Sequence, residues 1–162
     1  MEKVLLLLDT SGSMHGEKIS ALLYAARRFI CGLENITLHR EPLVSVITFG
    51  GQPVESSFLA LGQFSVWDIE AKGETRLSEA LRMAAVLAAP DTLCVLISDG
   101  LAMDGDFSKI QLDCPTYAIA IGYDADIFML SRFTGASERV FPPYEAEMLP
   151  GYLMQYDFNA TE

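Results

Sequence analysis

The fold is decided by the stretch Val4-Leu5-Leu6-Leu7-Leu8-Asp9-Thr10-Ser11-Gly12-Ser13-Met14. A short apolar run of this kind is typical of a strand that is buried on both faces of a sheet. Asp9 follows the run, where the strand meets solvent, and Ser11 and Ser13 follow at alternate positions in a turn. Three oxygen-bearing side chains therefore share one turn. What they do depends on whether other segments bring further oxygen atoms to the same place.

Strands and helices alternate along the rest of the chain. Apolar side chains at spacings of three and four predict helices, and short apolar or β-branched runs predict strands. The predicted helices are 17–33, 76–88, 108–112, 125–133 and 145–156, and the predicted strands are 4–8, 43–49, 54–59, 92–98, 115–121 and 139–141. This alternation predicts an α/β fold, with a doubly wound, mostly parallel sheet and helices on both faces. We expect one antiparallel edge strand, 54–59, and a single domain over residues 1–162.

The composition indicates a folded and strongly acidic chain. Of the 162 residues, 51% are hydrophobic and 20% are charged, which favours a dense core over disorder. The formal net charge is −11, from 22 acidic and 11 basic side chains. Because such a charge repels phosphate backbones and anionic membrane surfaces, we do not expect nucleic acid as a partner.

Cysteine usage and the apolar runs bear on the compartment. Cys31, Cys94 and Cys114 are scattered, which argues against a disulfide framework or a structural zinc site and suits a reducing compartment. The apolar run before Asp9 is too short for a signal peptide, and no run approaches the roughly 20 residues of a membrane helix. We therefore expect a cytoplasmic protein that does not insert into membranes.

Three distant segments are expected to meet at one edge of the sheet. In an open parallel sheet, ligands bind beyond the carboxyl ends of the strands, where the strand order reverses. Asp9 and Asp99 each follow a buried strand, and Thr75 precedes a helix that begins on the same edge. If the two strands flank the switch point, the set Asp9, Ser11, Ser13, Thr75 and Asp99 surrounds one point.

Every side chain in this set offers oxygen, and none offers nitrogen or sulfur. Hard divalent cations prefer oxygen ligands, so the set predicts a cation site, with Mg²⁺ the expected ion and Mn²⁺ or Ca²⁺ as alternatives. Hydroxyls are weak ligands, so three of them with two acids leave much of the ionic charge uncompensated. Such an ion would bind a further carboxylate, from a Glu or Asp of a partner protein.

These residues carry a family resemblance. Asp9-x-Ser11-x-Ser13, Thr75 in Gly73-Glu74-Thr75, and Asp99 in Ser98-Asp99-Gly100 together resemble the metal-ion-dependent adhesion site (MIDAS) of von Willebrand factor type A (vWA) domains, which have a Rossmann-like fold. The order of elements agrees over nearly the whole chain. Residues 7–14, followed by Gly16-Glu17-Lys18-Ile19, look most like the TerY-type bacterial branch linked to tellurium resistance.

The resemblance implies a role for each site residue. Ser11, Ser13 and Thr75 would coordinate the ion through their hydroxyls, while Asp9 and Asp99 would act mainly through bound water. Asp9 would also orient the serines, and an outside acid would complete an octahedron. The sequence departs from the family at position 74, where many relatives have a second glycine and this chain has Glu74. Glu74 either points away or competes with the incoming carboxylate.

Simpler readings exist for the same residues. Ser11 and Ser13 each suit the N-cap of the helix that begins near Glu17, and Thr75 suits the N-cap of the next helix. Capping does not explain why two strands end in aspartate. The acids in the segment after Asp99, which are Asp104 and Asp106, are either extra ligands or part of a solvated loop.

Two classes of function compete. The first is a non-enzymatic interaction module in which the cation captures an acidic side chain of a partner. By resemblance, such partners include a kinase, a phosphatase or another component of a bacterial stress response. The alternative is a Mg²⁺-dependent phosphohydrolase with Asp9 as nucleophile, but that chemistry needs a general acid two positions on, and position 11 is serine. The turn also lacks a phosphate-loop lysine, a three-glycine fingerprint and a nucleophile elbow.

Overall fold

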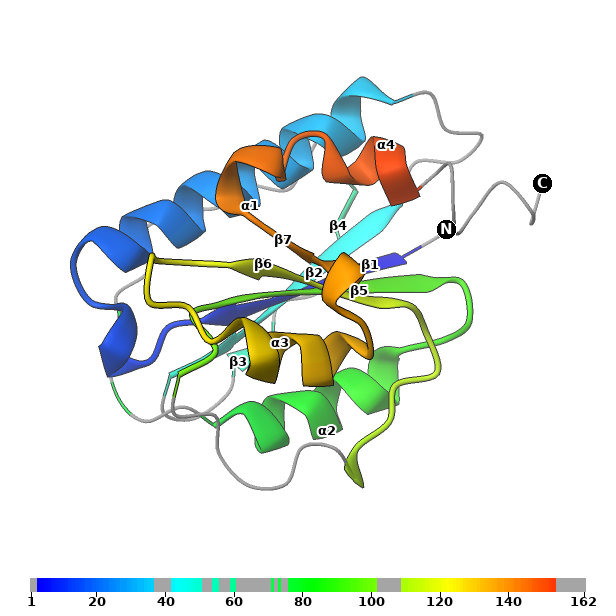
Figure 1. Ribbon diagram of the computed structural model, residues 1–162. Helices are drawn as coiled ribbons and strands as arrows, with labels where there is room; N and C mark the ends of the chain where they lie inside the picture. The colour runs from blue at the N-terminus through cyan, green and yellow to red at the C-terminus, as the bar shows by residue number, and fades with distance from the viewer. Residues whose placement is uncertain are drawn as a thin grey trace.

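A central parallel sheet organises the molecule. The structure is a computed structural model, and it describes residues 3–36, 42–50, 54–55, 59–60, 71, 73, 76–101 and 109–153. The parallel strands are β1 (Lys3–Asp9), β2 (Leu43–Phe49), β5 (Thr92–Ser98), β6 (Thr116–Ala120) and β7 (Val140–Phe141). They lie in the order β2-β1-β5-β6-β7, and every neighbouring pair in this series is parallel (Figure 1). The predicted α/β fold with a mostly parallel sheet is confirmed.

Short antiparallel pairings border this sheet beside β2. β3 (Val54–Glu55) pairs with β2 opposite Ile47 and Thr48, and β4 (Leu59–Ala60) pairs with β2 opposite Leu43 and Val44. The expected edge strand over 54–59 is thus represented, in the described residues, by two segments of two residues each. Residues 56–58 lie outside the described part of the chain.

Helices cover both faces of the sheet. α1 (Glu17–Asn35) and the short α4 (Leu149–Leu153) lie on one face, and α2 (Leu77–Leu87) and α3 (Ile127–Thr134) lie on the other (Figure 1). Among the described residues, 3₁₀ turns also occur at Gly12–Met14, Ser137–Arg139 and Pro143–Glu145. Within the described residues, we find no helix with the length and apolarity that a membrane crossing needs.

The alternation of side chains in β1 explains its continuous apolar sequence. Val4, Leu6 and Leu8 pack into the core beneath α1, while Leu5 and Leu7 pack into the core beneath α2. All five are fully buried. Because successive side chains of a strand point to opposite faces, a strand covered on both faces has no position for a polar residue until it leaves the sheet. Asp9 is that residue.

Two predicted helices differ from the structure. The expected helix over 145–156 is divided, in the described residues, into a 3₁₀ turn, Pro143–Glu145, and α4, Leu149–Leu153, and residues 154–156 lie outside the described part of the chain. Pro150 has no backbone N–H and its ring would clash with the carbonyl of residue 146, so it is tolerated only in a first helical turn. The expected helix over 108–112 is also wrong for its described residues, because Lys109 is in a 3₁₀ turn and residues 110–112 are irregular, while residue 108 lies outside the described part of the chain. Ile110 and Leu112 are partly buried and pack against the core beneath α2.

Candidate metal centre

Two buried acids lie side by side at the switch point of the sheet. β1 and β5 are adjacent and parallel, with Leu8 paired to Ile97, and the chain leaves β1 toward β2 on one side and later returns to β5 on the other. Asp9 ends β1 and Asp99 follows β5, and both side chains have no solvent exposure. The sequence prediction that these two strands flank the switch point is confirmed. Ligand sites in open parallel sheets lie at such a point.

The turn after β1 links the two acids through its serines. The Ser11 backbone N–H donates to Asp9 Oδ1 at 3.0 Å, and the Ser11 hydroxyl donates to the same oxygen at 2.6 Å. The Ser13 hydroxyl donates to Asp99 Oδ2 at 3.1 Å and lies 3.2 Å from the Ser11 hydroxyl. We call Asp9, Ser11, Ser13 and Asp99 the strand-end site.

The capping alternative is wrong for both serines. α1 has Gly16 at its N-cap with no side-chain cap, and Ser11 makes no capping bond to the 3₁₀ turn that follows it. The hydroxyls are instead directed at carboxylates. Thr75, Glu74, Asp104 and Asp106 lie outside the described residues, so their roles stay predictions. Gly73, two residues before Thr75, contacts the turn after β1, because its carbonyl accepts a hydrogen bond from the Gly12 N–H at 2.9 Å.

Ser98 holds Asp9 from the other side. Its hydroxyl donates to Asp9 Oδ2 at 2.6 Å and accepts from the Gly100 N–H at 3.0 Å. Both oxygens of Asp9 are therefore occupied, and the carboxylate is fixed in one orientation. Sequence reasoning missed this role. The available signal was a hydroxyl at the last position of an otherwise apolar buried strand, where an unpaired hydroxyl would be costly.

Lys18 is the second residue that sequence reasoning missed. Its ammonium group donates to Asp99 Oδ2 at 3.0 Å and to Asp124 Oδ2 at 3.1 Å, and its side chain is 19% exposed. Lys18 lies in the first turn of α1, off the apolar stripe, a position that predicts a solvated side chain. Nothing in the local sequence indicates its partners, because they lie 81 and 106 residues further along the chain.

The surroundings raise the pKa values of two groups, Asp9 and Lys18, for different reasons. Burial raises the pKa of Asp9, the hydrogen bonds from Ser11 and Ser98 lower it again in part, and the charge of Asp99 adds to the rise. For Lys18, burial by itself lowers the pKa, but the hydrogen bonds and charges of Asp124 and Asp99 outweigh it and the net shift is upward. A nearby positive charge would therefore stabilise the Asp9 carboxylate, while Lys18 is held in its charged form by Asp124 and Asp99.

The donor set fits a hard divalent cation. All four side chains of the strand-end site present oxygen. The described residues contain no group of three or more His, Cys, Asp or Glu that could hold a metal ion, so a cation here would depend on the serine hydroxyls as well as on the two acids. The Lys18 ammonium already lies against Asp99, which shows that this point attracts positive charge. Asp9, Ser11, Ser13 and Asp99 would hold the ion, with Thr75 as the predicted fifth residue.

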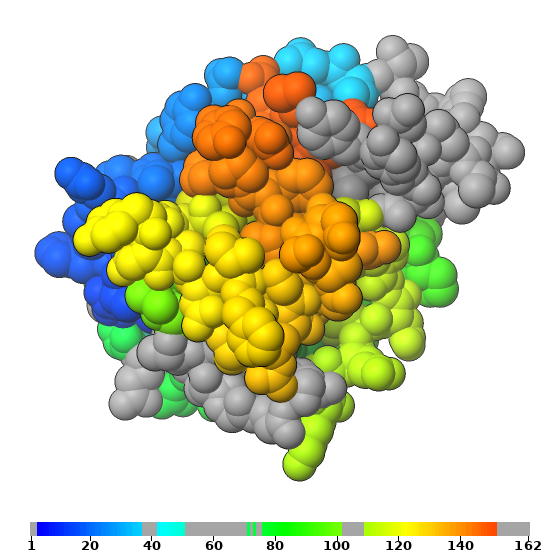
Figure 2. Space-filling view, viewed as in Figure 1, coloured from blue at the N-terminus to red at the C-terminus, as the bar shows by residue number. Residues whose placement is uncertain are grey.

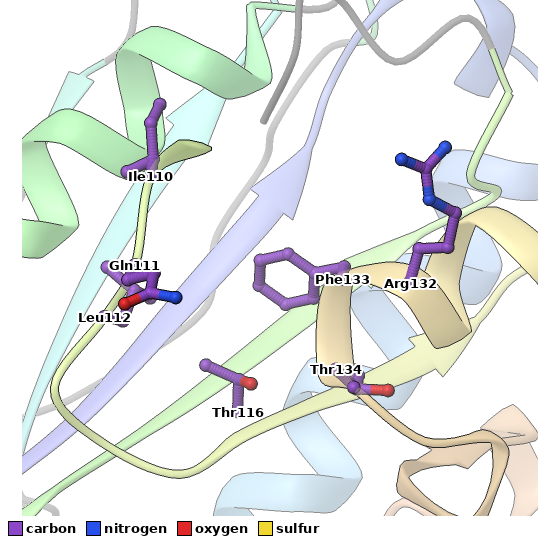
Figure 3. Close-up of a pocket in the computed structure, with 8 residues that line it drawn as sticks. Ile110, Gln111, Leu112, Thr116, Arg132, Phe133 and Thr134 are labelled. Atoms are coloured by element: carbon purple, nitrogen blue, oxygen red, sulfur yellow. The ribbon is translucent and has the colours of Figure 1, made fainter. Parts of the chain in front are cut away.

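A separate pocket lies at the opposite end of the sheet. It has a volume of about 300 Å³ and is lined by Ile110, Leu112, Thr116, Phe133 and neighbouring residues. Thr116 is the first residue of β6, whereas the strand-end site lies beyond the last residues of β1 and β5. Phe133 extends from α3 toward the segment that carries Gln111 and Leu112 (Figure 3). The pocket shares no residue with the strand-end site.

Comparison with solved structures identifies the fold, although no protein-family model and no curated protein matches the sequence. A von Willebrand factor type A protein from Catenulispora acidiphila has a TM-score of 0.61 at 16% identity, covering 97% of this chain and 43% of that one. The open pilus adhesin SpaC from Lactobacillus rhamnosus GG has a TM-score of 0.71 at 12% identity, covering 95% and 30%. Proximal thread matrix protein 1 of the mussel byssus, whose MIDAS motif holds zinc, has a TM-score of 0.68 at 14% identity, covering 95% and 47%.

These likenesses define the class of fold. The chain has the α/β fold of von Willebrand factor type A domains, which its sequence resembles. It spans less than half the length of each of the three proteins. In one of them the MIDAS motif holds a divalent metal ion, so the fold is compatible with the chemistry predicted for the strand-end site.

Proposed function

We propose that the chain is a non-enzymatic interaction module of the vWA type. It binds one divalent cation through Asp9, Ser11, Ser13, Thr75 and Asp99 and uses the ion to capture a Glu or Asp side chain of a partner protein. The observation that supports this most strongly is the linked set of two buried carboxylates and two hydroxyls at the switch point of the sheet.

The chemistry of the set favours capture over storage of the ion. Hydroxyls donate little charge, and Asp9 is already committed to Ser11 and Ser98. An ion held here keeps much of its charge and accepts a further carboxylate. Mg²⁺ is the ion we expect, and Mn²⁺ and Ca²⁺ suit the same oxygen donors.

An apolar rim beside the site supports partner binding. Tyr123, Ile127 and Phe128 are exposed large hydrophobic side chains in and after the loop that leaves β6. The Asp126 N–H in this loop donates to the Asp99 carbonyl at 2.8 Å, so the rim adjoins the site. In Figure 2 this loop (yellow) lies next to the start of α1 (blue). One clamped carboxylate gives modest affinity, and the rim would supply the buried area that a specific complex needs.

The biological setting follows from the resemblance to the TerY-type branch. We infer a bacterial, cytoplasmic protein that acts in a stress response similar to tellurium resistance, with partners such as a kinase or phosphatase of the same operon. The three cysteines are unpaired, which suits a reducing compartment.

The geometry does not favour the phosphohydrolase alternative. A nucleophilic Asp9 would need a free oxygen facing the substrate phosphorus. Both of its oxygens accept short hydrogen bonds, and its side chain has no exposure. Position 11 supplies a hydroxyl where that chemistry needs a second acid.

Metal titration tests the proposal directly. Titrating Mg²⁺ or Mn²⁺ into the wild type should show one site, and the double variant Ser11→Ala/Ser13→Ala should lack it. Equal binding by the two proteins contradicts the assignment. A metal-dependent pull-down from the native cell, comparing wild type with Thr75→Ala, then tests partner capture. Hydrolysis of a phosphate ester that disappears in Asp9→Asn would establish the enzymatic alternative instead.

A further inference from the structure

Lys18 places a positive charge inside the strand-end site. Its ammonium nitrogen lies 3.0 Å from Asp99 Oδ2, the same oxygen that accepts the Ser13 hydroxyl at 3.1 Å. The Asp99 side chain is fully buried, so this ammonium group is the cation that balances it. An ion bound beside the Ser13 hydroxyl would lie near that same oxygen, and therefore near the ammonium group.

A second carboxylate, that of Asp124, also contacts the Lys18 ammonium group. Lys18 Nζ is also 3.0 Å from Asp124 Oδ1, and the Asp124 side chain is 41% exposed, so a lysine paired with it alone remains partly solvated. The ammonium group contacts both acids at once. It can therefore leave Asp99 by a small rotation without losing its other partner.

The backbone is shaped around the lysine side chain. Gly122 has a φ of +90°, and a side chain there would place its Cβ 3.0 Å from Lys18 Cε and 2.9 Å from Asp124 Oδ1. A side chain at this position would crowd the ends of the Lys18 and Asp124 side chains, and its positive φ also favours glycine. The Lys18 side chain thus extends from α1 to the loop after β6, where it packs against Gly122.

We propose that Lys18 is a tethered cation that competes with the divalent ion for Asp99 and moves to Asp124 when the ion binds. Two cations at one carboxylate oxygen repel each other strongly in a buried site. Lys18 therefore lowers the metal affinity of the site and neutralises Asp99 when no metal is bound. Asp124 lowers the cost of displacing the lysine. This inference rests on the proposed metal-binding function and assigns to Lys18 the setting of its affinity.

Calorimetric titration of Mn²⁺ into five proteins, the wild type and four variants, tests the competition. We expect Lys18→Met to bind Mn²⁺ about tenfold more tightly than the wild type, since a buried positive charge next to the ion is removed. We expect Asp124→Asn to weaken binding several-fold in the wild type but to have little effect when combined with Lys18→Met. The charge-matched control is Arg27→Met, which removes an exposed cation about 13 Å along the same helix and should leave the affinity within about twofold.

Thermal unfolding gives a readout that does not depend on metal. Without metal, Lys18→Met should melt below the wild type, because Asp99 is left buried and unpaired, and Mn²⁺ should restore more of its stability than it adds to the wild type. Equal or weaker Mn²⁺ binding by Lys18→Met, with the wild type still binding, overturns the role of Lys18 and leaves the metal site intact. Binding by Lys18→Met alone supports the competition and contradicts metal-dependent capture by the native protein. Binding by neither protein overturns both proposals.

Discussion

At the scale of single residues, the site depends on hydroxyls that fix carboxylates. Asp9 is buried, and burial raises its pKa, while the hydrogen bonds from Ser11 and Ser98 lower that pKa in part. These two serines come from opposite sides, one from the turn after β1 and one from the end of β5. The sequence motif assigns no role to Ser98, yet its hydroxyl contacts both Asp9 and the Gly100 backbone.

Ser98→Ala is therefore expected to destabilise the protein by roughly 2–4 kcal/mol, because Asp9 Oδ2 and the Gly100 N–H each lose their buried partner. The same change removes a hydrogen bond that lowers the pKa of Asp9, so that pKa should rise further and metal affinity should fall. Urea unfolding and Mn²⁺ titration measure the two effects. The exposed Ser137→Ala serves as control and should change stability by less than about 0.5 kcal/mol. An unchanged midpoint for Ser98→Ala would contradict the bridging role.

The thiols provide an independent check on burial. Burial, together with the charge of Asp113, raises the pKa of Cys114 to about 11, and burial also raises the pKa of Cys94. Since the thiolate is the reactive form, about one Cys114 in a thousand is reactive at pH 8. Alkylation of Cys114 by iodoacetamide should thus be about a hundredfold slower than that of a thiol with a pKa of 9.0. As long as the pH stays below about 11, the rate should increase about tenfold for each unit of pH. Mass spectrometry of the labelled peptides measures this, and rapid labelling near neutral pH would disagree with the prediction.

At the scale of elements, apolar patterning was enough to predict the strands that carry the site, but it did not predict every residue in the site. β1 and β5 are buried on both faces, so their sequences are unbroken apolar runs that end where the sheet ends, and Asp9 and Asp99 could be placed from that pattern alone. Parallel pairing then brings the two ends together. Lys18 could not be predicted, because its position on α1 indicates solvent and its partners belong to loops far along the chain. The prediction of one long terminal helix was wrong at Pro150, because proline is not tolerated inside a helix and α4 therefore begins only at Leu149.

The turn after β1 also depends on β2, through a contact that no motif contains. A side chain at Gly50 would place its Cβ 2.6 Å from Thr10 Oγ1 and even closer to the Thr10 carbonyl. Gly50→Ala should therefore displace the turn, with a loss of stability of roughly 1–3 kcal/mol. Because Ser11 follows Thr10 directly, Mn²⁺ affinity should fall as well.

A matched glycine separates this effect from a general one. A side chain at Gly151 would meet nothing within 4 Å, so Gly151→Ala should leave Mn²⁺ affinity unchanged. Comparison of the two variants by denaturant unfolding and metal titration measures the specific contribution of the Gly50 contact. Similar metal affinities in both would show that the turn tolerates the displacement.

At the scale of the whole molecule, the acidic charge bears on the proposed metal site. The net charge of −11 destabilises the compact state through repulsion, and a divalent ion bound there would relieve part of it where two carboxylates are buried. Any ligand that binds only the folded chain also stabilises it by mass action.

Saturating metal is accordingly expected to raise the melting temperature. At a free Mn²⁺ concentration about a hundred times Kd, the gain is about 2.7 kcal/mol, or roughly 5–10 °C for a chain of this length. Excess EDTA should reverse the shift, and Ser11→Ala/Ser13→Ala should show none. Scanning calorimetry of the two proteins with and without metal makes the comparison. A shift of equal size in the double variant would place the stabilising ion elsewhere.

The double pairing of β1 has a consequence for how the molecule opens. β1 is bonded along its length to β2 and, over all but its last residue, to β5, so its amides are shielded from both edges. Strands of this kind exchange their amide hydrogens only when the entire domain unfolds. Asp9 therefore belongs to the part of the chain that unfolds last. The start of α3 has no such flanking ladder. The start of α3 can thus fluctuate while the geometry around Asp9 is preserved.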